Sequence, residues 1–267
     1  MEYSVIKFND NLYHFRDPLG VCFSIIKGSK KAIVVDTGYG IFDVKKTVEE
    51  YITTPYIVIN THGHMDHTAG NFRFDKVYVP SKDYDLFIEH NSIKRRTKNI
   101  KEALLRHLLP DGFDKDEYIN QTTNNTFPID CGQTIDLGNL HVEIIPMEGH
   151  TKGSIGLLIK ELKILLTGDA AIHAIWMFLK ESTDRNTYIN MLKRVKELDF
   201  DYFVTGHLME MYPKKYFDYY IEVAKNATPS NSKPTSYGDF GDKNTFEYVE
   251  FHEGVRFAFC YQEPKEY

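Results

Sequence analysis

The feature that most constrains this sequence is a dense group of candidate metal ligands directly after a short apolar strand. The strand predicted at 56–60 runs into THGHMDH at 61–67, which places three imidazoles and one carboxylate within six residues. Imidazole and carboxylate groups are metal ligands by type. His62 and His64 are two residues apart and can point the same way, whereas the adjacent Asp66 and His67 diverge and can serve a second ion. The alternative is a polar turn that happens to hold three of the eleven histidines.

Four further predicted strands end at residues of the same chemistry. In layered α/β folds, ligands gather outside the carboxyl ends of strands, so this placement is expected of a site. A glycine precedes three of the four residues and lets the backbone turn tightly beside a ligand. The candidates are Asp36, His150, Asp169 and His207, after strands predicted at 31–35, 140–146, 163–167 and 202–205.

The order of predicted elements indicates a layered α/β protein of two similar halves. Strands lead and helices follow, and the same order resumes after residue 126. No linker rich enough to separate two domains lies in the middle, so we expect one domain over residues 1–267. Residues 82–126 are predicted to form an amphipathic helical insertion or cap that packs near the cleft, and 245–262 a closing β-hairpin.

Composition and net charge limit the classes of binding partner and the cellular compartment that we expect for this protein. The formal charge of −6 makes the chain a poor binder of nucleic acid or of anionic membranes. The three cysteines are widely spaced and form no disulfide framework, and the N-terminus lacks the apolar core of a signal peptide. The longest uncharged apolar run, 170–179, is too short to span a membrane. We therefore expect a cytoplasmic protein with a small-molecule substrate; its oligomeric state is left open.

Five motifs occur together in this sequence: VVDTG at 34–38, HxHxDH at 62–67, GHTxGS at 149–154, TGD ending at Asp169 and TGH ending at His207. Together they resemble the metallo-β-lactamase superfamily. The resemblance implies a four-layer αββα sandwich with a dinuclear site in the cleft between its halves. It implies further that Asp169 bridges the two metals and that Asp36 orders the loop of ligands. By position, the first metal would be held by His62, His64 and His150, and the second by Asp66, His67 and His207.

This ligand set predicts metal-dependent hydrolysis. Neutral imidazoles and few carboxylates leave the metals Lewis-acidic, so a water between them ionises near neutral pH, and the resulting hydroxide attacks a carbonyl carbon or phosphorus. Asp66 is the candidate proton relay. We expect two divalent ions, zinc first, although manganese, iron and cobalt suit the same ligands.

The family resemblance also narrows the substrate. Antibiotic-hydrolysing members usually lack an aspartate at the bridging position, so Asp169 points toward glyoxalase-II-like thioesterases and lactonases. Glyoxalase II carries a C-terminal helical domain, whereas after His207 we expect one helix and a hairpin here. This chain has Ile172 where acyl-homoserine lactonases often have tyrosine. The leading expectation is hydrolysis of a small ester, thioester, lactone or amide. The alternatives are a mononuclear iron enzyme resembling persulfide dioxygenases, a phosphodiesterase and a non-catalytic binding scaffold.

Two segments bear on substrate recognition. Residues 170–179 (AAIHAIWMFL) follow Asp169 and hold Ile172, His173 and the single tryptophan, Trp176. These residues are predicted to form an apolar pocket wall with His173 near the leaving group, or else a buried connector. The run KRRTKNIK at 94–101 carries five basic residues, which either steer an anionic substrate or form a solvated helix face.

Overall fold

The computed structural model describes residues 3–237 and 244–262, and its N-terminal half builds one seven-stranded sheet. The strands follow one another in chain order across this sheet, β1 to β7. β1 to β4 pair antiparallel, and β4 to β7 pair parallel, with helix α1 as one of the crossovers. The bounds are β1 Ser4–Asn9, β2 Leu12–Arg16, β3 Cys22–Lys27, β4 Ala32–Val35, β5 Tyr56–Ile59, β6 Val77–Pro80 and β7 Thr126–Ile129.

A second, six-stranded sheet comes from the C-terminal half, in the order β14-β13-β11-β10-β9-β8. β11 and β13 run parallel, and α6 lies in the connection between them. The other neighbours pair antiparallel. The bounds are β8 Thr134–Asp136, β9 His141–Pro146, β10 Ile155–Ile159, β11 Ile164–Gly168, β13 Tyr202–Thr205 and β14 Met211–Pro213.

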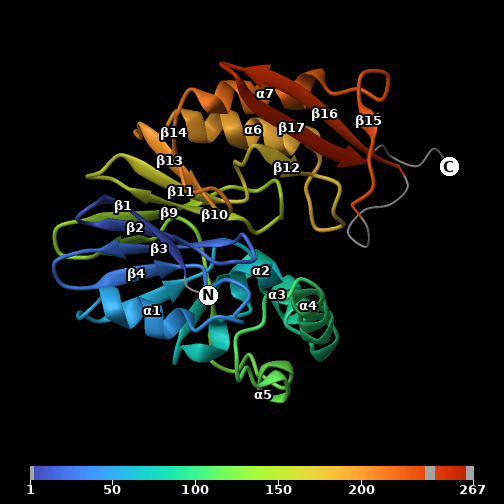
Figure 1. Ribbon diagram of the computed structural model, residues 1–267. Coiled ribbons are helices and arrows are strands. Elements are labelled where there is room, and N and C mark those ends of the chain that lie inside the picture. The colour runs from blue at the N-terminus through green and yellow to red at the C-terminus, as the bar shows by residue number, and fades with distance from the viewer. Residues whose placement is uncertain (1–2, 238–243, 263–267) are drawn as a thin grey trace.

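The two sheets face each other across an apolar core, with helices on their outer faces (Figure 1). Ile33 and Ile59 of the first sheet and Leu157 and Leu166 of the second are buried in this core. Helix α1 covers the first sheet, and α6 and α7 cover the second, which confirms the αββα sandwich. These helices span Val44–Tyr51, Arg185–Lys196 and Tyr216–Asn226. Within residues 3–237 and 244–262, no helix combines the length and the apolar character needed to cross a membrane.

The C-terminal strands form a layer that the sequence predicted only in part. The hairpin expected at 245–262 exists as β16 (Thr245–His252) and β17 (Val255–Gln262). It belongs to a four-stranded sheet, β12-β17-β16-β15, which packs on α6 and α7 through Phe257 and Phe259. β12 (Ala174–Trp176) lies in the apolar run after Asp169, and β15 is Lys233–Pro234. The shared packing supports the proposal of a single domain.

The helical insertion leaves the first sheet between β6 and β7. It contains three α-helices, α3 to α5, and α2 (Met65–Thr68) packs against α3 (Figure 1). Ile100 and Tyr118 of the insertion share a buried cluster with Met65, so the insertion lies on the loop that holds the candidate ligands. The bounds are α3 Tyr84–His90, α4 Ile93–Leu105 and α5 Lys115–Ile119.

Arg96 fastens this insertion to the sandwich and belongs to the basic run at 94–101. The side chain is 1% exposed. Its guanidinium donates to the carbonyl oxygens of Ala69 (3.2 Å) and Asn91 (3.3 Å) and to Asn91 Oδ1 (2.9 Å). It also lies over the rings of Phe72 and Tyr118. One basic residue of the run is therefore structural.

We predict that Arg96→Met destabilises the protein by about 1–3 kcal/mol, because the buried carbonyl groups it serves lose their donors. Urea unfolding monitored by circular dichroism measures the change. Lys94→Met on the exposed side of the same helix is the control and should shift stability by less than about 0.5 kcal/mol. Equal stability of the two variants would contradict the assignment.

Candidate metal centre

The candidate ligands come from strand ends of both central sheets and meet at one edge of the sandwich. His62 and His64 follow β5, and Asp66 and His67 lie in α2 immediately behind them. The three remaining ligands lie in the β9–β10 loop and directly after β11 and β13: His150, Asp169 and His207. Backbone hydrogen bonds join the two sheets at this edge, from Ile155 to Thr61 (2.8 Å) and from Cys22 to Gly206 (2.8 Å).

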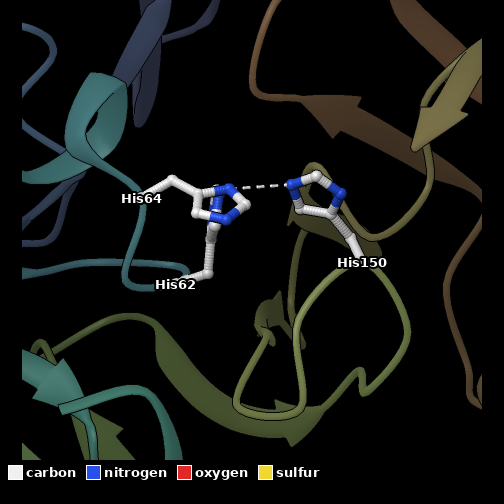
Figure 2. A group of neighbouring side chains, drawn as sticks. All are labelled: His62, His64 and His150. Carbon is white, nitrogen blue, oxygen red and sulfur yellow. Dashed lines mark hydrogen bonds between the residues drawn. The ribbon is translucent and has the colours of Figure 1, made fainter. Parts of the chain in front are cut away.

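His62, His64 and His150 form the first group of candidate ligands (Figure 2). Nδ1 of His64 lies 3.1 Å from Nε2 of His62 and 3.0 Å from Nε2 of His150. All three rings are buried. Three nitrogens bound to one zinc ion at 2.0–2.1 Å would lie about 3.3 Å apart, so the group has close to the spacing that one ion requires.

Asp66, His67, Asp169 and His207 form the second group. Nε2 of His67 lies 3.5 Å from Asp66 Oδ2 and 3.5 Å from Asp169 Oδ1, and Nε2 of His207 lies 3.1 Å from Asp169 Oδ2. Asp169 Oδ2 is also 3.8 Å from Nε2 of His150 in the first group. The Asp169 carboxylate therefore lies between the two groups, as a bridging ligand would.

Each of the five histidines faces a protein hydrogen-bond acceptor with the ring nitrogen that points away from the centre. A nitrogen held in this way carries the proton, which leaves the lone pair of the other nitrogen for a metal. The acceptors are Thr61 Oγ1 for His62 (3.1 Å), Glu181 Oε1 for His64 (2.7 Å), Asp36 Oδ2 for His67 (2.9 Å), the Trp176 carbonyl for His150 (2.9 Å) and the Gly20 carbonyl for His207 (3.1 Å).

Two buried atoms without hydrogen-bond partners also indicate that the candidate ligands fit metal ions. Nε2 of His67 and Oδ1 of Asp169 are buried polar atoms without a hydrogen-bond partner, and such atoms are costly unless something binds them. Gly206 lies against both residues, and a side chain there would meet Asp169 Oδ1 at 2.5 Å and the His67 ring at 2.7 Å. A cation placed between these atoms would satisfy both of them.

The electrostatics of the two groups differ. Burial, with neighbouring histidines, lowers the pKa of His62 well below its ordinary value and that of His150 to about 4, so both stay neutral as ligands must. Burial acts against the charge of Asp169, but His207 and His67 hold its pKa well below the usual range. Burial would also lower the pKa of His207, but Asp169 and Asp66 raise it to about 10. The second group thus attracts a cation, and a metal bound there replaces protons.

Asp36 lies behind the ligands, where the resemblance expected it. Its Oδ1 accepts from the Thr61 backbone N–H at 2.7 Å, and its Oδ2 accepts from the Thr61 hydroxyl at 2.8 Å and from His67 Nδ1. The residue has a φ of 66°, a conformation that L residues rarely adopt. Its buried carboxylate orders the backbone of the ligand loop and one of the ligands.

Two acidic residues beside the ligands were not predicted from the sequence. Asp83 accepts from the backbone N–H groups of Gly63 (3.0 Å) and Gly153 (2.8 Å) and from the Thr151 hydroxyl (2.6 Å), so it ties the loops of His62 and His150 together. Glu181 accepts from His64. Neither residue lies in one of the sequence motifs that hold the candidate ligands, and only their approach in the fold reveals them.

A cavity of about 800 Å³ opens onto both ligand groups. Ile172 and Trp176 of the expected pocket wall line it, and Phe178, Leu179 and helix α4 line it as well. His173 is not among the lining residues: its ring stacks on Phe257, and its Nδ1 lies 3.1 Å from the Tyr220 hydroxyl. In the β12 segment alternate side chains point to opposite faces, so His173 packs on α7 and the C-terminal sheet.

We predict that Glu181→Ala weakens metal binding about 10- to 100-fold, because His64 loses the acceptor that fixes its ring. Glu181→Gln keeps an acceptor oxygen and should weaken binding less. Competition with a chromophoric chelator measures the affinity. Glu102→Ala, which removes a carboxylate from the same cavity without a contact to the histidines, is the control. Unchanged affinity in Glu181→Ala would refute the role of this residue.

Several known proteins are similar to this chain. The human acyl-coenzyme A thioesterase MBLAC2 is 25% identical over 189 residues, and the hydroxyacylglutathione hydrolase GloC of Haemophilus influenzae is 26% identical over 150 residues. The matches cover 65% and 55% of this chain, and the chain spans 66% and 65% of the length of these relatives.

Solved structures share the fold at low identity. DIM-1 metallo-beta-lactamase superposes with a TM-score of 0.60 at 15% identity, covering 85% of this chain and 99% of the other. The sec-alkylsulfatase Pisa1 from Pseudomonas sp. gives 0.62 at 17% identity, covering 84% and 41%. The family model described as the metallo-beta-lactamase superfamily matches residues 16–207. This match includes most strands of both central sheets and all seven candidate ligands, and the chain therefore belongs to the metallo-beta-lactamase superfamily.

Proposed function

We propose that this protein is a dinuclear metal-dependent hydrolase that cleaves an acyl thioester of a small thiol. The observation that carries the proposal is the arrangement of the five histidines: each has one nitrogen held by the protein and the other directed into one of two adjacent ligand groups, with Asp169 lying between the groups. The names of the relatives, an acyl-coenzyme A thioesterase and a hydroxyacylglutathione hydrolase, favour a thioester among the substrates considered from the sequence.

The proposed centre holds two divalent ions, with zinc as the first expectation. The first site would use His62, His64 and His150, the second Asp66, His67 and His207, with Asp169 shared between them. When bound, such ions supply Lewis acidity, which lowers the pKa of a water molecule and polarises the substrate carbonyl.

The remaining chemistry belongs to the protein. Asp66 lines the cavity, and His67 and His207 hold its pKa below its ordinary value against the effect of burial, so it stays a carboxylate at neutral pH. A carboxylate at this place can accept a proton from the attacking water and deliver it to the leaving thiolate. The apolar residues Ile172, Trp176 and Phe178 exclude bulk water from one wall and offer a surface to the acyl group.

We predict that Asp169→Ala loses the second metal and more than about 100-fold in turnover, beyond the 10- to 100-fold typical of residues that only orient a ligand. The physical reason is that Asp169 is the carboxylate placed between the two groups. Metal content by mass spectrometry and thioester hydrolysis by thiol release measure the two effects, and circular dichroism checks that the fold persists. Full turnover at two metals per chain would contradict the bridging role.

Metal analysis and a comparison of substrates separate the alternative functions. One iron per chain, with visible absorbance, would favour the dioxygenase-like reading over a dinuclear hydrolase. Faster cleavage of a bis-aryl phosphate than of aryl esters and acyl thioesters would favour a phosphodiesterase.

We predict that Trp176→Ala and Phe178→Ala reduce the preference for long acyl chains about 10- to 200-fold, because each removes a large side chain from the apolar wall. The measurement is kcat/KM over a series of acyl thioesters of increasing chain length. Met177→Ala is the matched control, since Met177 lies between the two residues but packs into the helical core behind the wall. An unchanged chain-length preference in both wall variants would show that the segment is only core.

A further inference from the structure

The cavity changes character from its floor to its opening. The floor is formed by the buried ligands, among them His64 and His150. Three cationic residues also line the cavity: Arg95 and Lys98 on α4, and Lys180 in the segment after Leu179. The side chains of Arg95 and Lys180 are 32% and 66% exposed, which places them at the opening. We call Arg95, Lys98 and Lys180 the basic rim.

The basic residues on α4 point in different directions. If the run served only as a solvated helix face, none of its cations would need to line the cavity. Arg95 and Lys98 are three residues apart, which places them on one side of the helix, and both line the cavity. Lys94 and Lys101 are exposed and are not among the lining residues. Because the chain as a whole carries a charge of −6, cations gathered at one cavity stand out against the rest of the surface.

Within residues 3–237 and 244–262, three glutamates lie beside the basic rim. Glu89 accepts from Lys180 through both oxygens, at 2.7 and 2.8 Å, and lies 3.6 Å from Arg95, so one carboxylate holds two cations at the opening. Glu102 lines the same cavity one turn from Lys98. Glu181 is engaged by His64. Arg95 and Lys180 therefore share the single carboxylate of Glu89, and most of the five N–H donors of the Arg95 guanidinium are left for a ligand.

We propose that the basic rim binds an anionic group, phosphate or carboxylate, on the thiol carrier of the substrate. The inference rests on the proposed thioesterase function. The acyl group would then lie along the apolar wall and the thioester at the ligands. Water adds to the carbonyl carbon, the C–S bond breaks, and the carrier leaves as a thiol after taking one proton. The rim selects the carrier, whereas the wall selects the acyl group.

The experiment compares three thioesters with the same butyryl group: butyryl-coenzyme A, whose carrier has phosphates; S-butyryl-glutathione, whose carrier has carboxylates; and S-butyryl-N-acetylcysteamine, which is neutral. In the variant Arg95→Gln/Lys98→Gln, the ratio of kcat/KM for the preferred anionic substrate to that for the neutral one should fall about tenfold or more, mainly through KM. Lys94→Gln/Lys101→Gln removes the same charge from the same helix and is the matched control.

Two further measurements address the wild-type protein and the variants directly. Raising the ionic strength should reduce kcat/KM for the anionic thioester more than for the neutral one, because screening weakens partly exposed charges. Calorimetric binding of free coenzyme A and of free glutathione should weaken in Arg95→Gln/Lys98→Gln and in Lys180→Gln, and the carrier that shows the loss identifies phosphate or carboxylate as the ligand.

Each outcome decides the proposal. Hydrolysis of all three thioesters with equal selectivity in wild type, rim variant and control would overturn the basic rim while leaving the thioesterase function intact. Equal loss in the rim variant and the control would assign the effect to overall charge and would also overturn it. A wild-type enzyme that carries two metals and cleaves none of the thioesters would overturn the proposed function and the rim with it.

Discussion

The hydrogen bonds of the buried Asp36 carboxylate are the interactions on which the candidate metal centre depends. The carboxylate accepts from the backbone and the hydroxyl of Thr61 and from His67, and the same hydroxyl faces Nδ1 of His62. Asp36 thus orients His67 directly, His62 through the Thr61 hydroxyl, and the backbone immediately before His62. These contacts also hold the left-handed backbone of Asp36, a conformation that persists only where its surroundings over-determine it.

The fold brings this ordered ligand loop of the first sheet against the ligand loops of the second sheet. The loops after β5 and between β9 and β10 approach each other across the sandwich, and Asp83 hydrogen-bonds to both. Asp83 lies at the start of the helical insertion, and Arg96 fastens the same insertion to Ala69 beyond α2. The insertion is therefore a wall of the cavity and a brace for the ligand loops at once, because it leaves the sheet at the edge where the ligands gather.

The cavity has three surfaces, and each would bind a substrate through a different kind of interaction. Buried imidazoles and carboxylates at the floor are selective for cations, because burial makes their charges and lone pairs costly unless they are bound. The wall around Trp176 contributes apolar contact without direction. The exposed cations on α4 act over a longer range and are weakened by salt. A substrate with a carbonyl, an apolar chain and a distal anion would match all three in one orientation.

The sequence by itself determined a layered α/β fold and the candidate ligands, because both follow from local patterns: short apolar strands, each followed by a glycine or a polar turn that presents a histidine or an aspartate. The four-layer sandwich and the division of the ligands into two groups followed from the family resemblance of these motifs. The pairing of the C-terminal hairpin with β12 and β15, helix α5, and the contacts of Asp83 and Glu181 could not be predicted, since they depend on segments that are distant in the chain. Trp176 and His173 show the limit within one segment. Both lie in the same apolar run, and the pairing of β12 with β17 turns Trp176 into the cavity and His173 into the core. Which side of a strand is buried depends on what packs against it, and only the tertiary structure supplies that neighbour.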